Sequence, residues 1–311
     1  HRSVAQPCQA ARHATAHATI GHGTANIMMI HPLRLALPFF SAVQAVGAFS
    51  FLSTRASSWT SSAAHVIEHL TSPPLQLTPL EELANTRIPG PSGSNVDILA
   101  YKATPSGSNE GEPLPLLILI HEFFGLNPSI VEKARGLADD LGCIVVAPDT
   151  FRGDVTDFIP KAIWLALSTP QQRVNDDLDA VCSYLNANDG NLAVMGFCYG
   201  GGKAIRYTSQ RRPDAATVVF YGSPLTNVGE LRRLKAPVCG VYGSKDAQFP
   251  MPLLDEFRKS LEDAGVENDV RVYDGVGHAF WTDMDQVKSG QQPQKDAYEQ
   301  CTTFLRRFFG G

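Results

Sequence analysis

The chain has 311 residues, 43% of them hydrophobic and 18% charged, which excludes collagen-like, coiled-coil and wholly disordered proteins. The 26 Lys and Arg residues against 31 Asp and Glu residues give a formal net charge of −5, so no nucleic acid partner is expected. The six cysteines show neither a CxxC pair nor a zinc-like spacing with histidine, so we expect no disulfide scaffold and no metal site.

Residues 1–74 differ in composition from the rest and are predicted to be a presequence. Only one acidic residue, Glu68, lies among the first 72 residues, against four arginines. The apolar run 35–52 is typical of a signal-peptide core, and the Ser- and Thr-rich stretch 49–64 is typical of an organelle transit peptide. This order resembles the bipartite presequences of algae with secondary plastids, which predicts delivery to a plastid.

A plain secretory signal and a single membrane anchor are the alternatives for this presequence. The apolar run is marginal for an anchor, because spanning a bilayer needs about 20 apolar residues. We expect no stable membrane insertion of the domain that follows.

Residues 75–311 are predicted to form one α/β domain, because short apolar runs alternate with segments of helical period. This pattern is typical of a mostly parallel sheet with helices on both faces. The predicted strands, in chain order, are Leu116–Ile120, Cys143–Ala147, Leu192–Met195, Ala216–Tyr221, Val238–Tyr242 and Val270–Tyr273. The predicted helices lie between and after them, with apolar stripes over 130–141, 174–185, 254–261 and 298–308. Ser129 and Glu132 are predicted to form the capping box of the first helix.

Cys198 occupies a different setting from the four cysteines predicted to pack in the core, which are Cys143, Cys182, Cys239 and Cys301. It is the centre of Gly196-Phe197-Cys198-Tyr199-Gly200, where an apolar strand runs into glycines and then into a helix expected from about Lys203. Tiny residues two before and two after the centre predict a nucleophile elbow, with cysteine where the common motif has serine. The helix N-terminus beyond it favours a thiolate. A structural turn or a nucleotide loop is the alternative, although the GxGxxG and Walker A patterns are absent.

A thiol nucleophile needs a proton acceptor, and outside the presequence only His121 and His278 are available. His278 follows the last predicted strand, and Asp246 follows an intervening one, which is the chain order that such a triad requires. Asp246 would hold the imidazole tautomer and stabilise the imidazolium. For each residue alone, a solvated surface position is the alternative.

The run His121-Glu122-Phe123-Phe124-Gly125-Leu126 follows the first strongly apolar strand and is predicted to lie beside the elbow. The backbone N–H groups of Phe123 and Tyr199 are predicted to form an oxyanion hole, in which each donor contributes about 2.7–4 kcal/mol in the transition state. Glu122 would direct its carboxylate toward the nucleophile.

These four motifs together resemble the dienelactone hydrolase family of α/β-hydrolases, over about residues 95–310. The resemblance implies an α/β-hydrolase fold and a triad of Cys198, Asp246 and His278. It also implies that Glu122 associates with the thiol in the resting enzyme and helps to generate the thiolate when substrate arrives.

Two positions depart from the family pattern. In the bacterial members that hydrolyse dienelactone, an arginine four residues beyond the catalytic histidine helps to grip the substrate carboxylate, and this chain has Thr282 there. A second arginine is expected ahead of Trp164, where this chain has Asp154 and Asp157, and Arg152 matches it only loosely. These departures predict weak recognition of a substrate carboxylate.

Aromatic residues in the predicted loops would suit an apolar or aromatic acyl or lactone group, with core packing as the alternative. The predicted substrate-binding residues are Phe124, Phe249, Phe280 and Trp281. The sequence therefore predicts a hydrolase that needs no cofactor and cleaves a small-molecule ester or lactone through a cysteinyl thioester. A ligand-binding or redox-sensing protein that uses Cys198 without turnover is the alternative.

Overall fold

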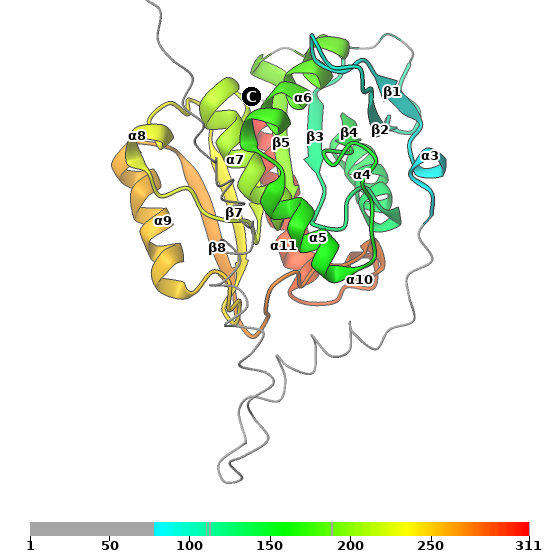
Figure 1. The fold of residues 1–311 in the computed structure, drawn as a ribbon. Helices are drawn as coiled ribbons and strands as arrows, with labels where there is room; N and C mark the ends of the chain where they lie inside the picture. The colour runs from blue at the N-terminus through cyan, green and yellow to red at the C-terminus, as the bar shows by residue number, and fades with distance from the viewer. Residues whose placement is uncertain (1–77, 110, 112, 188, 311) are drawn as a thin grey trace, which may run out of the picture. The chain divides into compact units, whose positions relative to one another are not determined.

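A computed structural model describes residues 78–109, 111, 113–187 and 189–310 (Figure 1). The predicted presequence, residues 1–74, lies outside the described residues, so its signal, transit and plastid assignments stay predictions.

The described residues form one sheet of eight strands in the order β1-β2-β4-β3-β5-β6-β7-β8. The pairs β1–β2 and β2–β4 are antiparallel, and all the other pairs are parallel. The strands are β1 Thr86–Ile88, β2 Ile98–Ala103, β3 Leu116–Ile120, β4 Ile144–Pro148, β5 Leu192–Phe197, β6 Ala216–Phe220, β7 Val238–Gly243 and β8 Asn268–Tyr273. All six predicted strands are present, and the prediction of a mostly parallel α/β sheet is confirmed. The prediction omitted β1 and β2, the two strands that form the antiparallel pairs of the sheet.

Helices cover both faces of this sheet, as the alternating pattern predicted. Helices α4, α10 and α11 pack on one face and α6, α7 and α9 on the other, so that α11 lies behind the sheet in Figure 1. The helices of the described residues are α3 Leu80–Leu83, α4 Pro128–Leu141, α5 Ile159–Ser168, α6 Gln171–Tyr184, α7 Tyr199–Arg211, α8 Val228–Leu231, α9 Met251–Ala264, α10 Met284–Lys288 and α11 Gln294–Phe309, with a 3₁₀ turn at Asp189–Asn191. None of them combines the length and the apolar character that a membrane crossing requires.

The central strands are buried on both faces, which explains their nearly continuous apolar sequences. Along β5, Leu192 and Val194 face the cluster under α6 and α7, whereas Ala193, Met195 and Phe197 face the cluster under α4 and α11. The four cysteines assigned to the core are all buried, which confirms that prediction.

Two predicted helix starts were wrong. Helix α4 is capped by Asn127, whose side-chain oxygen accepts the N–H of Ile130 at 3.1 Å, and Pro128 takes the first helical position. Proline suits that position because its missing N–H would have no partner there. Ser129 instead faces the segment around Thr282. Helix α7 begins at Tyr199, directly after Cys198, rather than near Lys203.

Candidate active site

The predicted site residues lie at one edge of the sheet, because the carboxyl ends of parallel strands meet there. Glu122 follows β3, Cys198 follows β5, Asp246 follows β7 and His278 follows β8. Strands β3, β5, β6, β7 and β8 are parallel neighbours, so residues up to 156 positions apart in the chain share this edge.

The turn at Cys198 has strained backbone geometry. Cys198 adopts φ 50° and ψ −111°, a positive φ that residues with a side chain rarely adopt, and its N–H donates to the carbonyl oxygen of Phe220 at 2.9 Å. A Cβ built on Gly196 would lie 2.1 Å from the carbonyl oxygen of Gly200, so the chain can turn this tightly only with glycine there. The turn leaves the thiol half-buried at the start of α7.

The three proposed triad side chains are in direct contact. Nδ1 of His278 lies 2.7 Å from Oδ2 of Asp246, and Nε2 of His278 lies 3.1 Å from Sγ of Cys198. The other oxygen of Asp246, which is 3% exposed, accepts the N–H of Gln248 at 2.8 Å. Both carboxylate oxygens therefore have donors, and the imidazole is held between a carboxylate and a sulfur.

This environment changes the proton affinity of His278. Burial opposes a charge on the ring, but the hydrogen bonds to Asp246 and Cys198 outweigh burial and raise the pKa of His278 to about 10. The contacts with Asp246 and Cys198 therefore favour the protonated ring.

Glu122 is placed near the nucleophile but does not bind it in this structure. Its Oε1 lies 3.3 Å from the hydroxyl of Tyr221, and that hydroxyl also lies 3.1 Å from the carbonyl oxygen of Trp281. The thiol of Cys198 bonds to His278 instead, so the resting association that the family resemblance implied for Glu122 is not seen. The deeply buried Tyr221 has a pKa raised well above its usual value by desolvation and by the neighbouring Glu122 and Cys198.

The two predicted oxyanion donors lie on the two segments that flank the site. Tyr199 is the first residue of α7, where backbone N–H groups have no acceptor within the helix. Phe123 lies in the turn closed by the N–H of Gly125 on the carbonyl oxygen of Glu122 at 3.2 Å. Among the hydrogen bonds of the described residues, none uses the N–H of Phe123 or Tyr199.

His121 is fully buried and holds the turn at Glu122 through hydrogen bonds of its ring. The sequence analysis did not assign this role to it. The backbone N–H of Thr150 donates to its Nε2 at 3.1 Å, so Nε2 must be the acceptor of the ring. Nδ1 then carries the proton and donates to the carbonyl oxygen of Glu122 at 2.6 Å. Chain order separated His121 from the predicted triad, but only the complete fold shows which groups its ring contacts.

The aromatic residues predicted to bind substrate divide into two pairs. The half-buried Phe249 has its ring centre 5.7 Å from that of His278, and the half-buried Phe124 packs on Phe123 at 4.1 Å. Phe280 and Trp281, at 8% and 0% exposure, are core residues, so the prediction was wrong for both. Both rings pack in the hydrophobic cluster under α4 and α11.

Arg152 and Thr282, at the two departures from the family's arginine pattern, both bond to neighbouring carboxylates. Arg152 is held by Asp177, with Nη2 to Oδ1 at 2.5 Å and Nε to Oδ2 at 3.2 Å, so it is not a free ligand for substrate. The exposed side chain of Thr282 donates to Asp283 at 2.8 Å. Trp164, on α5, is 62% exposed.

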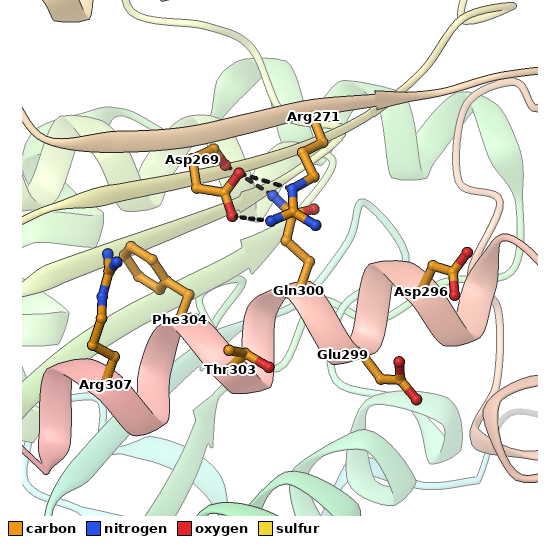
Figure 2. A pocket seen from close by; sticks show the side chains of 8 residues that line it. All are labelled: Asp269, Arg271, Asp296, Glu299, Gln300, Thr303, Phe304 and Arg307. Carbon is orange, nitrogen blue, oxygen red and sulfur yellow. Dashed lines mark hydrogen bonds and ion pairs between the residues drawn. The ribbon is translucent and has the colours of Figure 1, made fainter.

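A cavity of about 400 Å³ lies elsewhere, between β8 and α11, and none of the triad residues lines it. Figure 2 shows the ion pair of Asp269 and Arg271, 2.9 Å apart, along its β8 side. Among the described residues, no group of three His, Cys, Asp or Glu side chains is arranged to hold a metal ion.

Comparison with known proteins extends the resemblance seen in the motifs. The model of the dienelactone hydrolase family matches residues 98–309. A Salmonella typhimurium protein named "Putative carboxymethylenebutenolidase" is 33% identical over 231 residues, covering 69% of this chain and 84% of that protein. An Escherichia coli protein of the same name is 34% identical over 215 residues, covering 64% of this chain and 77% of that protein.

Solved structures agree with these sequence similarities. The crystal structure of a "Putative Dienelactone Hydrolase" from Klebsiella pneumoniae matches with a TM-score of 0.61 and 27% identity, over 71% of this chain and 96% of that one. A dienelactone hydrolase-like promiscuous phosphotriesterase from metagenomic libraries matches with a TM-score of 0.57 and 21% identity, over 72% of this chain and 98% of that one. The second match bears on the fold alone.

Proposed function

The chain belongs to the dienelactone hydrolase family of ester and lactone hydrolases, and we propose that it cleaves its substrate through a thioester formed on Cys198. The observation that carries the proposal is the unbroken contact from Asp246 through His278 to Cys198, with distances of 2.7 Å and 3.1 Å. Those distances lie within reach of proton transfer.

The first half-reaction acylates the enzyme. The thiolate of Cys198 attacks the carbonyl carbon, and the N–H groups of Phe123 and Tyr199 stabilise the oxyanion that forms. When the tetrahedral intermediate collapses, the carbon–oxygen bond to the leaving group breaks. The imidazolium of His278 gives its proton to the departing alkoxide, while Asp246 keeps the ring oriented.

The second half-reaction restores the enzyme with one water molecule. Neutral His278 takes a proton from that water as its oxygen attacks the thioester carbonyl. The carbon–sulfur bond then breaks, the acid is released, and Cys198 and His278 return to the thiolate and imidazolium forms. Cysteine, imidazole, carboxylate and backbone donors supply every group that these two steps use.

We propose an uncharged ester or lactone as the substrate class. The half-buried rings of Phe124 and Phe249 offer apolar contact, whereas Arg152 is already engaged by Asp177. The carboxymethylenebutenolidase name of the relatives supports a lactone as the reacting group, although the carboxymethylene part of that name denotes a carboxylate-bearing substrate.

The test is mass spectrometry of the intact chain mixed rapidly with an activated aryl ester. We expect an acyl adduct on Cys198 that disappears with turnover, and loss of both adduct and turnover in Cys198→Ala. Cys182→Ala, in which a buried core cysteine is changed, is the matched control and should keep both. Unchanged turnover in Cys198→Ala would refute the thioester mechanism. A single stable acylation without product release would instead indicate the ligand-binding or redox-sensing alternative.

We also propose that residues 1–74 direct the chain to a plastid, on the composition of that segment alone. Fusion of residues 1–74 to a fluorescent protein in an alga with secondary plastids tests this. Secretion of the fusion would overturn the proposal.

A further inference from the structure

The segment that follows His278, residues 279–282 and here called the histidine segment, is held by buried side chains from three different elements. Three successive carbonyl groups each accept a hydrogen bond from one of them. The pairs are Phe280 with Gln294 Nε2 at 2.8 Å, Trp281 with Tyr221 Oη at 3.1 Å, and Thr282 with Lys133 Nζ at 2.8 Å. Because the donors come from α11, the end of β6 and α4, the segment is fixed from several sides at once.

This segment begins with strained backbone. Ala279, directly after His278, has φ 52°, a left-handed conformation that residues with a Cβ rarely adopt. Such strain persists only where the surroundings over-determine the conformation. The three side-chain donors provide that restraint within four residues of the imidazole.

Lys133 is the unusual member of this set, because it is a lysine with only 1% of its surface exposed. Its Nζ donates to Ser129 Oγ at 2.8 Å as well as to Thr282, and both acceptors are neutral. It also lies 5.1 Å from the ring centre of Phe197 and 5.2 Å from that of Trp281, within the range of a cation–π contact. Phe197 directly precedes Cys198, so one ammonium group contacts both the nucleophile turn and the histidine segment.

Burial makes a charge on the ammonium group of Lys133 costly. Burial lowers the pKa of Lys133, and the carboxylates of Glu122, Asp283 and Glu132 oppose that effect, Glu122 most strongly. An apolar side chain of similar length would fill the same volume without desolvating a cation. Packing alone therefore does not account for a lysine at this position.

We propose that Lys133 is a positioning residue, which ties the segment after His278 to α4 and to the nucleophile turn so that the imidazole stays between Asp246 and Cys198. The proposal rests on the proposed function, since it assumes that His278 is the acid and base. It assigns Lys133 no contact with substrate.

Lys133→Met in the full chain is the test, because methionine keeps the volume and removes the charge and the donors. The readout is the far-downfield proton resonance of His278 Nδ1–H, which is assigned by its absence in His278→Gln. We expect this resonance to broaden or disappear in Lys133→Met. We also expect kcat to fall about 10- to 100-fold with little change in KM, the size of effect that small misplacements of catalytic groups produce.

The matched control is Arg135→Met on the same helix. Arg135 makes the same kinds of contact with Tyr101, a hydrogen bond of 2.5 Å and a ring contact of 5.2 Å, but does not touch the histidine segment. It should leave the resonance and kcat unchanged. Lys133→Gln, which keeps a neutral donor, should fall between wild type and Lys133→Met, and it serves as the test variant if the methionine protein does not fold.

Two results would overturn the proposal. One is a folded Lys133→Met protein with the wild-type resonance and kcat. The other is a protein that loses thermal stability alone, which would make Lys133 a structural residue. The resonance needs no turnover, so it decides this proposal even if Cys198→Ala shows that the thioester mechanism is wrong.

Discussion

Gly200 packs so closely against Ile120 that a Cβ built on Gly200 would lie 2.3 Å from the carbonyl oxygen of Ile120. This contact joins the start of α7 to the end of β3. It sets the nucleophile turn against the loop that carries Glu122 and Phe123, and the two proposed oxyanion donors depend on it.

Gly200→Ala should therefore separate these two segments or prevent folding. We expect at least about a 100-fold loss of kcat/KM, comparable to removing one oxyanion donor, together with a lowered melting temperature. Gly190→Ala is the control, because a Cβ there meets nothing within 4 Å. Steady-state kinetics and thermal melts of both variants check the prediction, and an active, stable Gly200→Ala protein would contradict it.

The raised pKa of His278 predicts a pH dependence of stability. Its folded value of about 10 lies above the usual value of about 6.5, so the folded state binds this proton more tightly than the unfolded state. The stabilisation is fully present below about pH 6.5 and is lost as the pH rises through about 10. Urea unfolding of wild type and His278→Gln should show a stability difference that shrinks over this range. A difference independent of pH would argue against the raised pKa.

Thr282→Arg should strengthen recognition of a substrate carboxylate, if the departures from the family's arginine pattern weaken it. Thr282 is exposed and lies four residues after His278, the position at which the family resemblance implies an arginine that helps to bind a substrate carboxylate. A charge-assisted pair should lower KM for carboxylate-bearing esters about 10-fold relative to neutral esters. Thr282→Gln should not produce this change. If wild type already prefers carboxylate-bearing esters, the proposed substrate class is wrong.

Alkylation should distinguish Cys198 from the other described cysteines. Burial raises the pKa of Cys143 to about 12, and it raises the pKa of Cys239 and Cys301 as well. Cys198 is half-buried beside the His278 imidazole, so iodoacetamide should label it first. Peptide mass spectrometry after short exposures measures the order of labelling. Equal labelling of Cys143 and Cys198 would show that the thiol is not activated.

Local patterns in the sequence were sufficient for much of the fold. Five of the six predicted strands are central strands that are almost fully buried and read as apolar runs, whereas the sixth, β8, is a half-buried strand at the sheet edge. Strands β1 and β2 were missed: β1 has only three residues, and β2 mixes buried and half-buried residues without a continuous apolar run. The start of α4 was misplaced because Asn127 and Ser129 are both suitable caps, and only Pro128 in the first turn decides between them.

In the site, too, some features could be predicted from the sequence and others could not. Chain order and glycine spacing were enough to select Cys198, Asp246 and His278, because parallel strands bring their carboxyl ends to one edge whatever the details of packing. The residues next to Phe280 and Trp281 in the sequence do not predict that these two side chains are buried. Their burial depends on α4, α10 and α11, which lie far from them in the sequence or follow them in the chain.

The sequence by itself determined the alternation of strands and helices, the tight turn at Cys198 and the two departures from the arginine pattern, because each is a property of neighbouring residues. Only the tertiary structure decided that His121 bonds to the carbonyl oxygen of Glu122, and that Lys133 lies buried against the histidine segment. The physical reason is that a side chain's burial and partners come from long-range contacts, which periodicity and motif spacing do not encode.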